Sequence, residues 1–205
     1  MILKTALKHN THGYYHYRIH RHKTEKLCQP QYKKLKDYLH KMLTNCPHEH
    51  FLKGPRSSIL KFKLNSKLKN ESNQVEILAR IGLDSNYYDE AHMNVQMFML
   101  AYDEKTIAIE TPIWLQPNEL ENYEEIFKTN LPLTGHIDLI RIENDGKIWI
   151  WDYKPNAHRE KYADTQTYFY ALMLSKRTNI PLKNFMCGYF DTKNTYIFDP
   201  NKIKL

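Results

Sequence analysis

The chain is poor in cysteine and glycine and contains no long apolar run. Its 205 residues include 3 Cys and 6 Gly. No stretch reaches the roughly 20 apolar residues of a membrane span, and the N-terminus lacks the apolar segment of a secretory signal. An odd number of widely spaced cysteines, without Cys-x-x-Cys, argues against a disulfide framework and favours a reducing compartment; they are Cys28, Cys46 and Cys187. We therefore expect a cytoplasmic protein with no membrane partner.

Acidic residues are scarce in the first third of the chain. Residues 1–70 carry 16 Lys and Arg against 3 Asp and Glu, whereas residues 71–205 carry 14 against 20. Aromatic residues are interleaved with the basic ones: Tyr14, Tyr15, Tyr17, Tyr32, Tyr38 and Phe51. Cations mixed with stacking rings are typical of a groove for single-stranded nucleic acid. The alternative is a solvated basic face that serves solubility.

The N-terminal region, 1–73, is expected to be basic, rich in His and Tyr, and mostly helical. Residues 1–24 show no clean apolar period, so we expect an irregular or marginally helical arm there. Residues 30–44 have a helical apolar stripe, and 59–73 a polar connection. If the arm were helical, four histidines would align as a zinc site, but Gly13 interrupts them and no cysteine or carboxylate completes the set; they are His9, His12, His16 and His20.

A regular α/β pattern begins near residue 74. The expected elements are a helix at 88–102, a strand at 107–114, a short helix at 118–128, a hairpin of 134–143 and 147–154, a helix at 159–177, and strands at 184–191 and 195–199. The order helix, three strands, helix, strand predicts an α/β sandwich with a mixed central sheet. We assign this unit to residues 74–205.

The hairpin brings two carboxylates together. The turn Asn144-Asp145-Gly146, with Gly146 left-handed, pairs Glu143 with Lys147. That register places Asp138 directly opposite Asp152. Directly opposed residues have Cβ atoms roughly 4.5–5.5 Å apart, so both carboxylates reach one hard cation.

The second hairpin strand is expected to be buried on both faces. Ile148 and Ile150 share a face with Asp152 and Lys154, and the other face carries Trp and Tyr. Buried charges must be paired, hydrogen-bonded or bound to metal. A structural Asp152–Lys154 ion pair is the alternative, but it leaves the second carboxylate of Asp138 unexplained.

Three motifs together resemble the PD-(D/E)XK nuclease superfamily. They are Gly135-His136-Ile137-Asp138, Asp152-Tyr153-Lys154 and Gln166-x-x-x-Tyr170. The nearest branch is the RecB-like one, which includes CRISPR-associated RecB-like exonucleases and nucleases of archaeal viruses. The resemblance covers roughly residues 85–200 and implies a restriction-endonuclease-like αβββαβ core.

The resemblance implies roles for individual residues. His92 and the carbonyl of Tyr153 would join Asp138 and Asp152 in holding Mg²⁺ or Mn²⁺, and an imidazole ligand makes Mn²⁺ more acceptable. Lys154 would orient the attacking water or stabilise the transition state. The alternative for His92 is a residue on the helix surface.

The following helix contributes the last motif. Gln166 would hydrogen-bond substrate or Lys154, and Tyr170 would position the nucleic-acid strand; a packed helix stripe is the alternative for Tyr170. Glu110 is an accessory carboxylate outside the metal ligands. Cys46-Pro47 is similar to a Cys-Pro that helps hold an iron–sulfur cluster in many members of the branch, but the C-terminal region offers only Cys187, so we predict no cluster.

These expectations define a divalent-metal-dependent deoxyribonuclease. It would act on single-stranded DNA or DNA ends during replication, recombination or repair. A junction-resolving endonuclease of the same superfamily and a non-catalytic nucleic-acid-binding protein are the alternatives. The sequence leaves open DNA versus RNA, exonuclease versus endonuclease action, and whether the protein forms a homo-oligomer.

Overall fold

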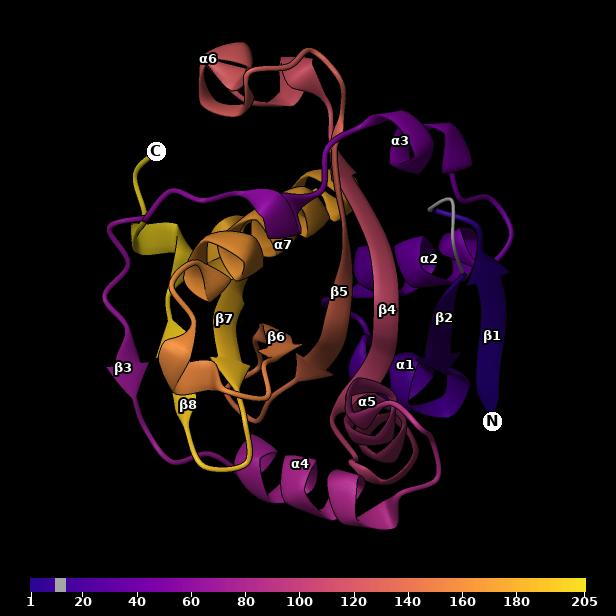
Figure 1. Ribbon diagram of the computed structural model, residues 1–205. Coiled ribbons are helices and arrows are strands. Elements are labelled where there is room, and N and C mark those ends of the chain that lie inside the picture. Colours follow the sequence, from indigo (N-terminus) through magenta and orange to yellow (C-terminus); the bar gives the residue numbers. More distant parts are fainter. Residues whose placement is uncertain (10–13) are drawn as a thin grey trace.

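The molecule is built on one mixed β-sheet. The structure is a computed structural model that describes residues 1–9 and 14–205. In that part of the chain, eight strands lie in the order β1-β2-β4-β5-β6-β7-β8-β3, with β1 at one edge and β3 at the other (Figure 1). The strands are β1 (Ile2–Leu7), β2 (Tyr15–His20), β3 (Lys69–Asn70), β4 (Thr106–Leu115), β5 (Leu133–Ile142), β6 (Ile148–Tyr153), β7 (Phe185–Phe190) and β8 (Thr195–Phe198). Neighbours are antiparallel except β6 and β7, which are parallel.

Helices cover both faces of this sheet. The α-helices are α1 (Arg21–Leu27), α2 (Lys33–Met42), α3 (His48–Lys53), α4 (Gln74–Ser85), α5 (Ala91–Tyr102), α6 (Tyr123–Phe127) and α7 (Ala163–Thr178). Side chains of α2 and α7 share one hydrophobic cluster with the sheet, and those of α4 and α5 share another. None of the helices in the described ranges combines the length and apolar character that a membrane span requires.

The central strands confirm the expected α/β fold with a mixed sheet. Helix α5 precedes β4, β5 and β6, and α7 then crosses over to the parallel strand β7. All residues of β5 and β6 are buried, as expected for strands covered by helices on both faces. The hairpin also has the predicted register: Leu139 pairs with Trp151 and Ile142 with Ile148, and Gly146 has φ +72°.

The expectation of an irregular or marginally helical arm at residues 1–24 is wrong over most of its length. Strands β1 and β2 form a hairpin that extends the sheet beside β4. Tyr17 and Ile19 are fully buried there. Their alternation with exposed or half-buried residues is the period-2 signal of a strand, which the many histidines and tyrosines obscure.

The histidine stripe does not form on a helix. His16 and His20 lie on β2, and the His20 side chain caps α1 by accepting a hydrogen bond from the Lys23 backbone N–H. His9 follows β1, and His12 lies outside the described residues. The helices expected at 88–102 and 159–177 begin three and four residues later, at Ala91 and Ala163.

Candidate active site

Asp138 lies at the centre of a cluster of ionisable side chains on β5. In the β4–β5 register, Ile109 pairs with Leu139 and Thr111 with Ile137, which leaves Glu110 opposite Asp138. On the other side, the pairing of Leu139 with Trp151 places Asp152 next in line beside Asp138. Three carboxylates from three adjacent strands therefore converge around Asp138.

Glu110 lies closer to this centre than the sequence indicated. Its φ is +51°, a left-handed conformation within a strand, which for a residue other than glycine is a strained conformation often found at functional sites. The Gln96 side-chain amide donates a 2.7 Å hydrogen bond to the Glu110 carboxylate. We expected Glu110 outside the metal ligands because the pairing of β4 with β5, which sets it opposite Asp138, is a long-range contact.

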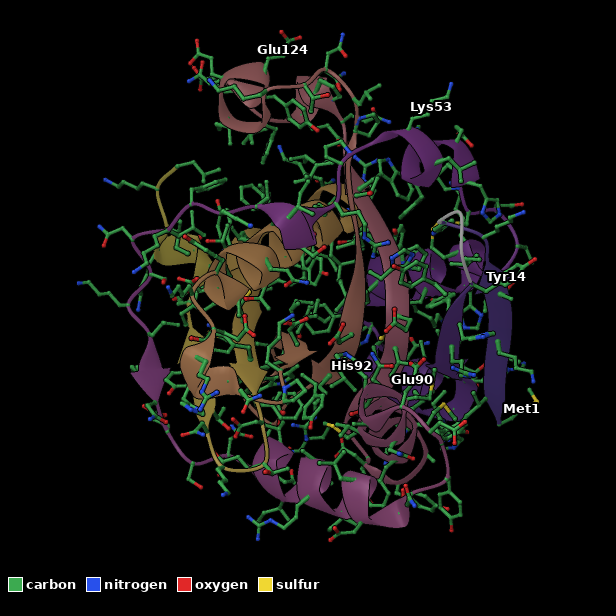
Figure 2. All side chains as sticks on the ribbon, viewed as in Figure 1. Met1, Tyr14, Lys53, Glu90, His92 and Glu124 are labelled. Atoms are coloured by element: carbon green, nitrogen blue, oxygen red, sulfur yellow. The ribbon has the colours of Figure 1, made fainter. Side chains whose placement is uncertain are left out.

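Helix α5 adds a nitrogen ligand to the cluster. His92 Nε2 lies 2.6 Å from Asp138 Oδ2, and the side chain extends from α5 toward β5 (Figure 2). The Tyr153 backbone N–H donates to the same oxygen at 3.0 Å. Three ligand atoms, one from each of His92, Glu110 and Asp138, lie within 4.8 Å of one another. These three residues can therefore contact a single ion.

A chain of hydrogen bonds continues from Asp152 into helix α7. Lys154 Nζ lies 2.7 Å from Asp152 Oδ2 and donates to Gln166 Oε1 at 3.1 Å. Gln166 Nε2 in turn donates to the Tyr170 hydroxyl at 2.6 Å. Tyr170 is 3% exposed, so its ring is packed in the interior and holds Gln166 in place. A Cβ at Gly135 would lie 2.5 Å from that ring, which accounts for the glycine in the first motif.

Burial and the neighbouring charges shift the pKa values of the clustered groups. Burial, reinforced by the neighbouring Asp138, raises the pKa of Asp152 and of Glu110. Burial also acts to raise the pKa of Asp138, but the charge and hydrogen bond of His92, together with the Lys154 charge and the Tyr153 N–H, hold that pKa below its usual value. Burial acts to lower the pKa of His92, but the charge and hydrogen bond of Asp138, with the charges of Asp152 and Glu110, raise it.

This arrangement fits a hard divalent cation. Two of the three convergent ligand groups are carboxylates and the third is an imidazole, a donor set that accepts Mg²⁺ or Mn²⁺. A cation there would neutralise the excess negative charge that, in addition to burial, raises the pKa of Asp152 and Glu110. Lys154 supplies a positive charge beside Asp152.

A cavity of about 490 Å³ opens beside Glu110. Tyr14, Tyr15, Arg18 and Tyr88 contribute to its lining. Tyr14 is 60% exposed and Tyr88 39%. The cavity therefore brings aromatic rings, a basic side chain and two further carboxylates, Asp89 and Glu90, next to the carboxylate cluster.

Arg56 is a basic residue near the site that the sequence did not single out. Its guanidinium lies over the Tyr15 ring at 4.6 Å and 3.3 Å from His136 Nδ1. Its charge also acts to lower the pKa of Glu110, against the larger effects of burial and Asp138 that raise it. Nothing in the local sequence indicates that Arg56 lies beside β5.

Most of the rings proposed to stack on nucleic acid belong to the hydrophobic core instead. Tyr17, Tyr32, Tyr38 and Phe51 are all buried. Tyr17 donates to the Leu39 carbonyl at 2.7 Å, and Tyr38 donates to the Pro112 carbonyl at 2.6 Å. That part of the sequence interpretation is wrong because these four side chains belong to the hydrophobic cluster between the sheet and its covering helices.

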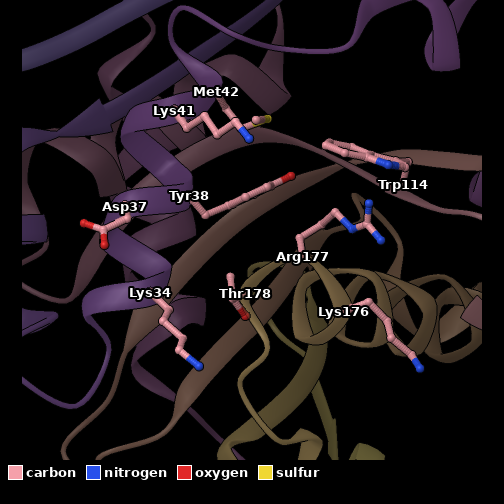
Figure 3. A pocket seen from close by; sticks show the side chains of 9 residues that line it. All are labelled: Lys34, Asp37, Tyr38, Lys41, Met42, Trp114, Lys176, Arg177 and Thr178. Atoms are coloured by element: carbon pink, nitrogen blue, oxygen red, sulfur yellow. The ribbon is translucent and has the colours of Figure 1, made fainter.

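A second hollow, of about 540 Å³, lies between α2, Trp114 of β4 and the end of α7 (Figure 3). Lys34, Lys41 and Lys176 line it, and Arg177 lies over the Trp114 ring at 4.7 Å. It contains none of the clustered carboxylates. We regard it as a basic surface separate from the candidate active site.

Comparison with known families identifies the class of protein. The family model of the PD-(D/E)XK nuclease superfamily matches residues 14–204, and the chain belongs to that superfamily. Membership implies a phosphodiesterase that acts on nucleic acid with divalent metal ions, typically Mg²⁺ or Mn²⁺. Searches of curated proteins and of solved structures gave no match. The match begins just before β2, so the family resemblance extends beyond the range 85–200 that the motifs covered.

Proposed function

We propose that the protein is a divalent-metal-dependent deoxyribonuclease of the RecB-like branch that cleaves single-stranded DNA or DNA ends. The observation that carries this proposal is the convergence of His92, Glu110 and Asp138 ligand atoms within 4.8 Å, beside the Asp152–Lys154 pair. A bound divalent ion supplies an activated water and neutralises charge on the phosphate. The replication, recombination or repair setting and a cytoplasmic location belong to the same proposal.

Each residue of the site has a distinct part in the proposed reaction. His92, Asp138, Asp152 and the Tyr153 carbonyl hold the ion, and Glu110 joins them, which revises its expected accessory position. Lys154 orients the attacking water and places positive charge near the developing phosphorane. Gln166 fixes the Lys154 ammonium, and Tyr170 fixes Gln166, so both act as positioning residues.

The preference for single strands is supported by the cavity beside Glu110. Tyr14 and Tyr88 offer exposed rings on which unpaired bases can stack, and Arg18 offers charge for the backbone. Bases in a duplex are already stacked on each other and gain less from such rings. A junction-resolving activity and a non-catalytic binding role are the competing functions.

The first prediction concerns cleavage itself. Purified protein should degrade end-labelled single-stranded DNA with Mn²⁺ or Mg²⁺ and lose that activity in chelator, because the carboxylates need the ion to act on a phosphodiester. Duplex and four-way junction DNA should be cut more slowly. Preferential cutting of the junction would support the resolvase instead, and binding without cleavage of any substrate would support the non-catalytic function.

A second prediction concerns Arg56. In an anisotropy titration of labelled single-stranded DNA, Arg56→Gln should weaken binding about tenfold, the worth of one charge-assisted hydrogen bond. The slope of log affinity against log salt should fall by about 0.7, the value for one lost contact to a single-strand phosphate. Lys202→Gln removes the same charge from a side chain that is 74% exposed and should leave both quantities unchanged. Equal effects from the two variants would show that Arg56 does not contact the DNA.

The predicted lack of an iron–sulfur cluster is part of the proposal. Cys187 Sγ lies 3.4 Å from the Thr167 carbonyl, inside the core between α7 and β7. Cys28 is buried as well, and Cys46 Sγ lies against His9. Three thiols placed in this way do not offer the four ligands of a cluster.

The division of the chain also remains a proposal. We retain an N-terminal region, 1–73, and a nuclease unit, 74–205, as a description of how the sequence is organised. Strands β1, β2 and β3 of the first region nevertheless join the sheet of the second. The N-terminal region therefore completes the nuclease sheet at both of its edges.

A further inference from the structure

A second group of metal-ligating side chains lies away from the carboxylates. His9, two residues after β1, lies close to Cys46, just before α3, and to His48, the first residue of α3. His9 Nε2 lies 3.0 Å from His48 Nδ1 and 3.7 Å from Cys46 Sγ. His9 is buried and Cys46 is 9% exposed, whereas His48 lies at the surface.

These separations are those of ligands around a tetrahedral ion. With Zn–N near 2.0–2.1 Å and Zn–S near 2.3 Å, tetrahedral geometry sets two nitrogens about 3.3 Å apart and a nitrogen and a sulfur about 3.6 Å apart. The His9–His48 and His9–Cys46 distances agree with those values to within about 0.4 Å. Small side-chain rotations would therefore admit an ion between the three atoms.

The surroundings of His9 are those of a fixed metal ligand. Its ring stacks on Phe51 with centroids 3.8 Å apart and planes 9° apart. Its other nitrogen, Nδ1, lies 2.8 Å from His136 Nε2. Metal-bound histidines almost always donate their second ring N–H to a neighbouring acceptor, which sets the tautomer and the ring orientation.

We propose that His9 Nε2, His48 Nδ1 and Cys46 Sγ bind a zinc ion. These three are the protein ligands that the described residues supply, and a water takes the fourth position. Thiolate and imidazole are the donors that zinc prefers, whereas the carboxylate cluster suits Mg²⁺ or Mn²⁺. The site ties the end of β1 to the start of α3 and, through His136, to β5. It is independent of the proposed nuclease activity and distinct from the stripe of four histidines.

The alternative to a zinc ion is a hydrogen bond in which a proton lies between His9 Nε2 and His48 Nδ1. Arg56 donates to His136 Nδ1, so a neutral His136 carries its hydrogen on Nε2 and donates it to His9 Nδ1. A neutral His9 then carries its own hydrogen on Nε2, where it faces His48. Zinc replaces that last hydrogen and reverses the tautomers of His9 and His136, so His136 then carries its hydrogen on Nδ1 and no longer accepts from Arg56. The two arrangements therefore exclude each other and give opposite results in metal-binding measurements.

Cobalt substitution distinguishes them without any activity assay. Protein stripped with chelator and titrated with Co²⁺ should develop the thiolate-to-cobalt charge-transfer band and the strong visible bands of tetrahedral cobalt, at one equivalent per chain. Zinc added afterwards should abolish both and raise the melting temperature. Cys46→Ser should remove the charge-transfer band, and His48→Ala, at an exposed position, should weaken cobalt binding at least tenfold.

Two controls make the result specific. His50→Ala alters another histidine of α3, one that contacts Gln116 rather than His9, and should bind cobalt as the wild type does. His92→Ala disrupts the carboxylate site and should keep the charge-transfer band. A wild-type protein without that band, or a band that persists in Cys46→Ser, would overturn the proposal and leave the histidines joined by protons.

Discussion

Asp138→Asn is expected to reduce DNA cleavage by about 10³-fold while the protein still binds single-stranded DNA. Asp138 is the carboxylate that contacts His92 and lies between Glu110 and Asp152. Stabilisation of the transition-state charge by a metal is worth several kcal/mol, and about 4 kcal/mol corresponds to 10³ in rate. The amide is nearly isosteric, so the loss arises from charge rather than from shape.

The fold should survive this substitution. The amide oxygen of the Asp138→Asn side chain can still accept from the Tyr153 N–H, as the carboxylate does at 3.0 Å. Removal of one negative charge also relieves the repulsion that raises the pKa of Asp152 and Glu110, alongside their burial. Asp84→Asn, which changes an exposed carboxylate on α4, is the matched control. Cleavage by Asp138→Asn within tenfold of the control would exclude the assigned centre.

The candidate site was predicted best where it depends on local strand geometry. A single turn, Asn144-Asp145-Gly146, fixes the hairpin register, and the alternation of side chains then follows from period 2. The neighbouring placement of Asp138 and Asp152 needs nothing else. Local helix geometry likewise predicts that Gln166 and Tyr170, one helical turn apart, share a face, and the two side chains are hydrogen-bonded to each other.

The site was predicted poorly where it depends on long-range contacts. Glu110 joins Asp138 through a left-handed residue in β4 and a pairing to a strand 28 positions later. Arg56 reaches the site because the segment after α3 returns alongside β5, with an Arg56–Thr134 bridge. No periodicity in a single sequence encodes either contact, since both are set by how separate elements dock.

The prediction for the N-terminal segment, which forms the β1–β2 hairpin, was wrong for a different reason. Tyr15, Tyr17 and Ile19 carry the alternation of a strand, but their composition also suits a nucleic-acid groove. Tyr17 is buried because β2 joins β4 and packs against α2, where its hydroxyl donates to Leu39. Composition alone does not distinguish an aromatic ring that stacks on bases from one that fills a core.

Arg141→Met is expected to lower the free energy of unfolding by about 3–5 kcal/mol, the cost of leaving buried charges without a partner. Arg141 on β5 is fully buried. Its Nε donates to Asp103 Oδ2 at 3.0 Å, and its Nη1 lies 2.8 Å from Glu143 Oε1. Methionine has similar length and fills the space, but it leaves Asp103 without its charged partner. Glu143 keeps Lys105, whose Nζ lies 2.9 Å from its Oε2, so most of the loss comes from Asp103.

Urea unfolding followed by circular dichroism measures this loss, and Arg21→Met is the matched control. Arg21 forms an exposed ion pair with Glu25 at 2.9 Å, and such surface pairs are worth about 0–1 kcal/mol. Asp103→Asn in the Arg141→Met background should recover part of the lost stability, because it removes the stranded charge while its side-chain oxygen can still accept from the Thr106 backbone N–H, as Asp103 does at 2.9 Å. Equal stabilities for the two methionine variants would show that the buried network contributes no more than a surface pair, and that packing of β4 against β5 alone holds this end of the sheet.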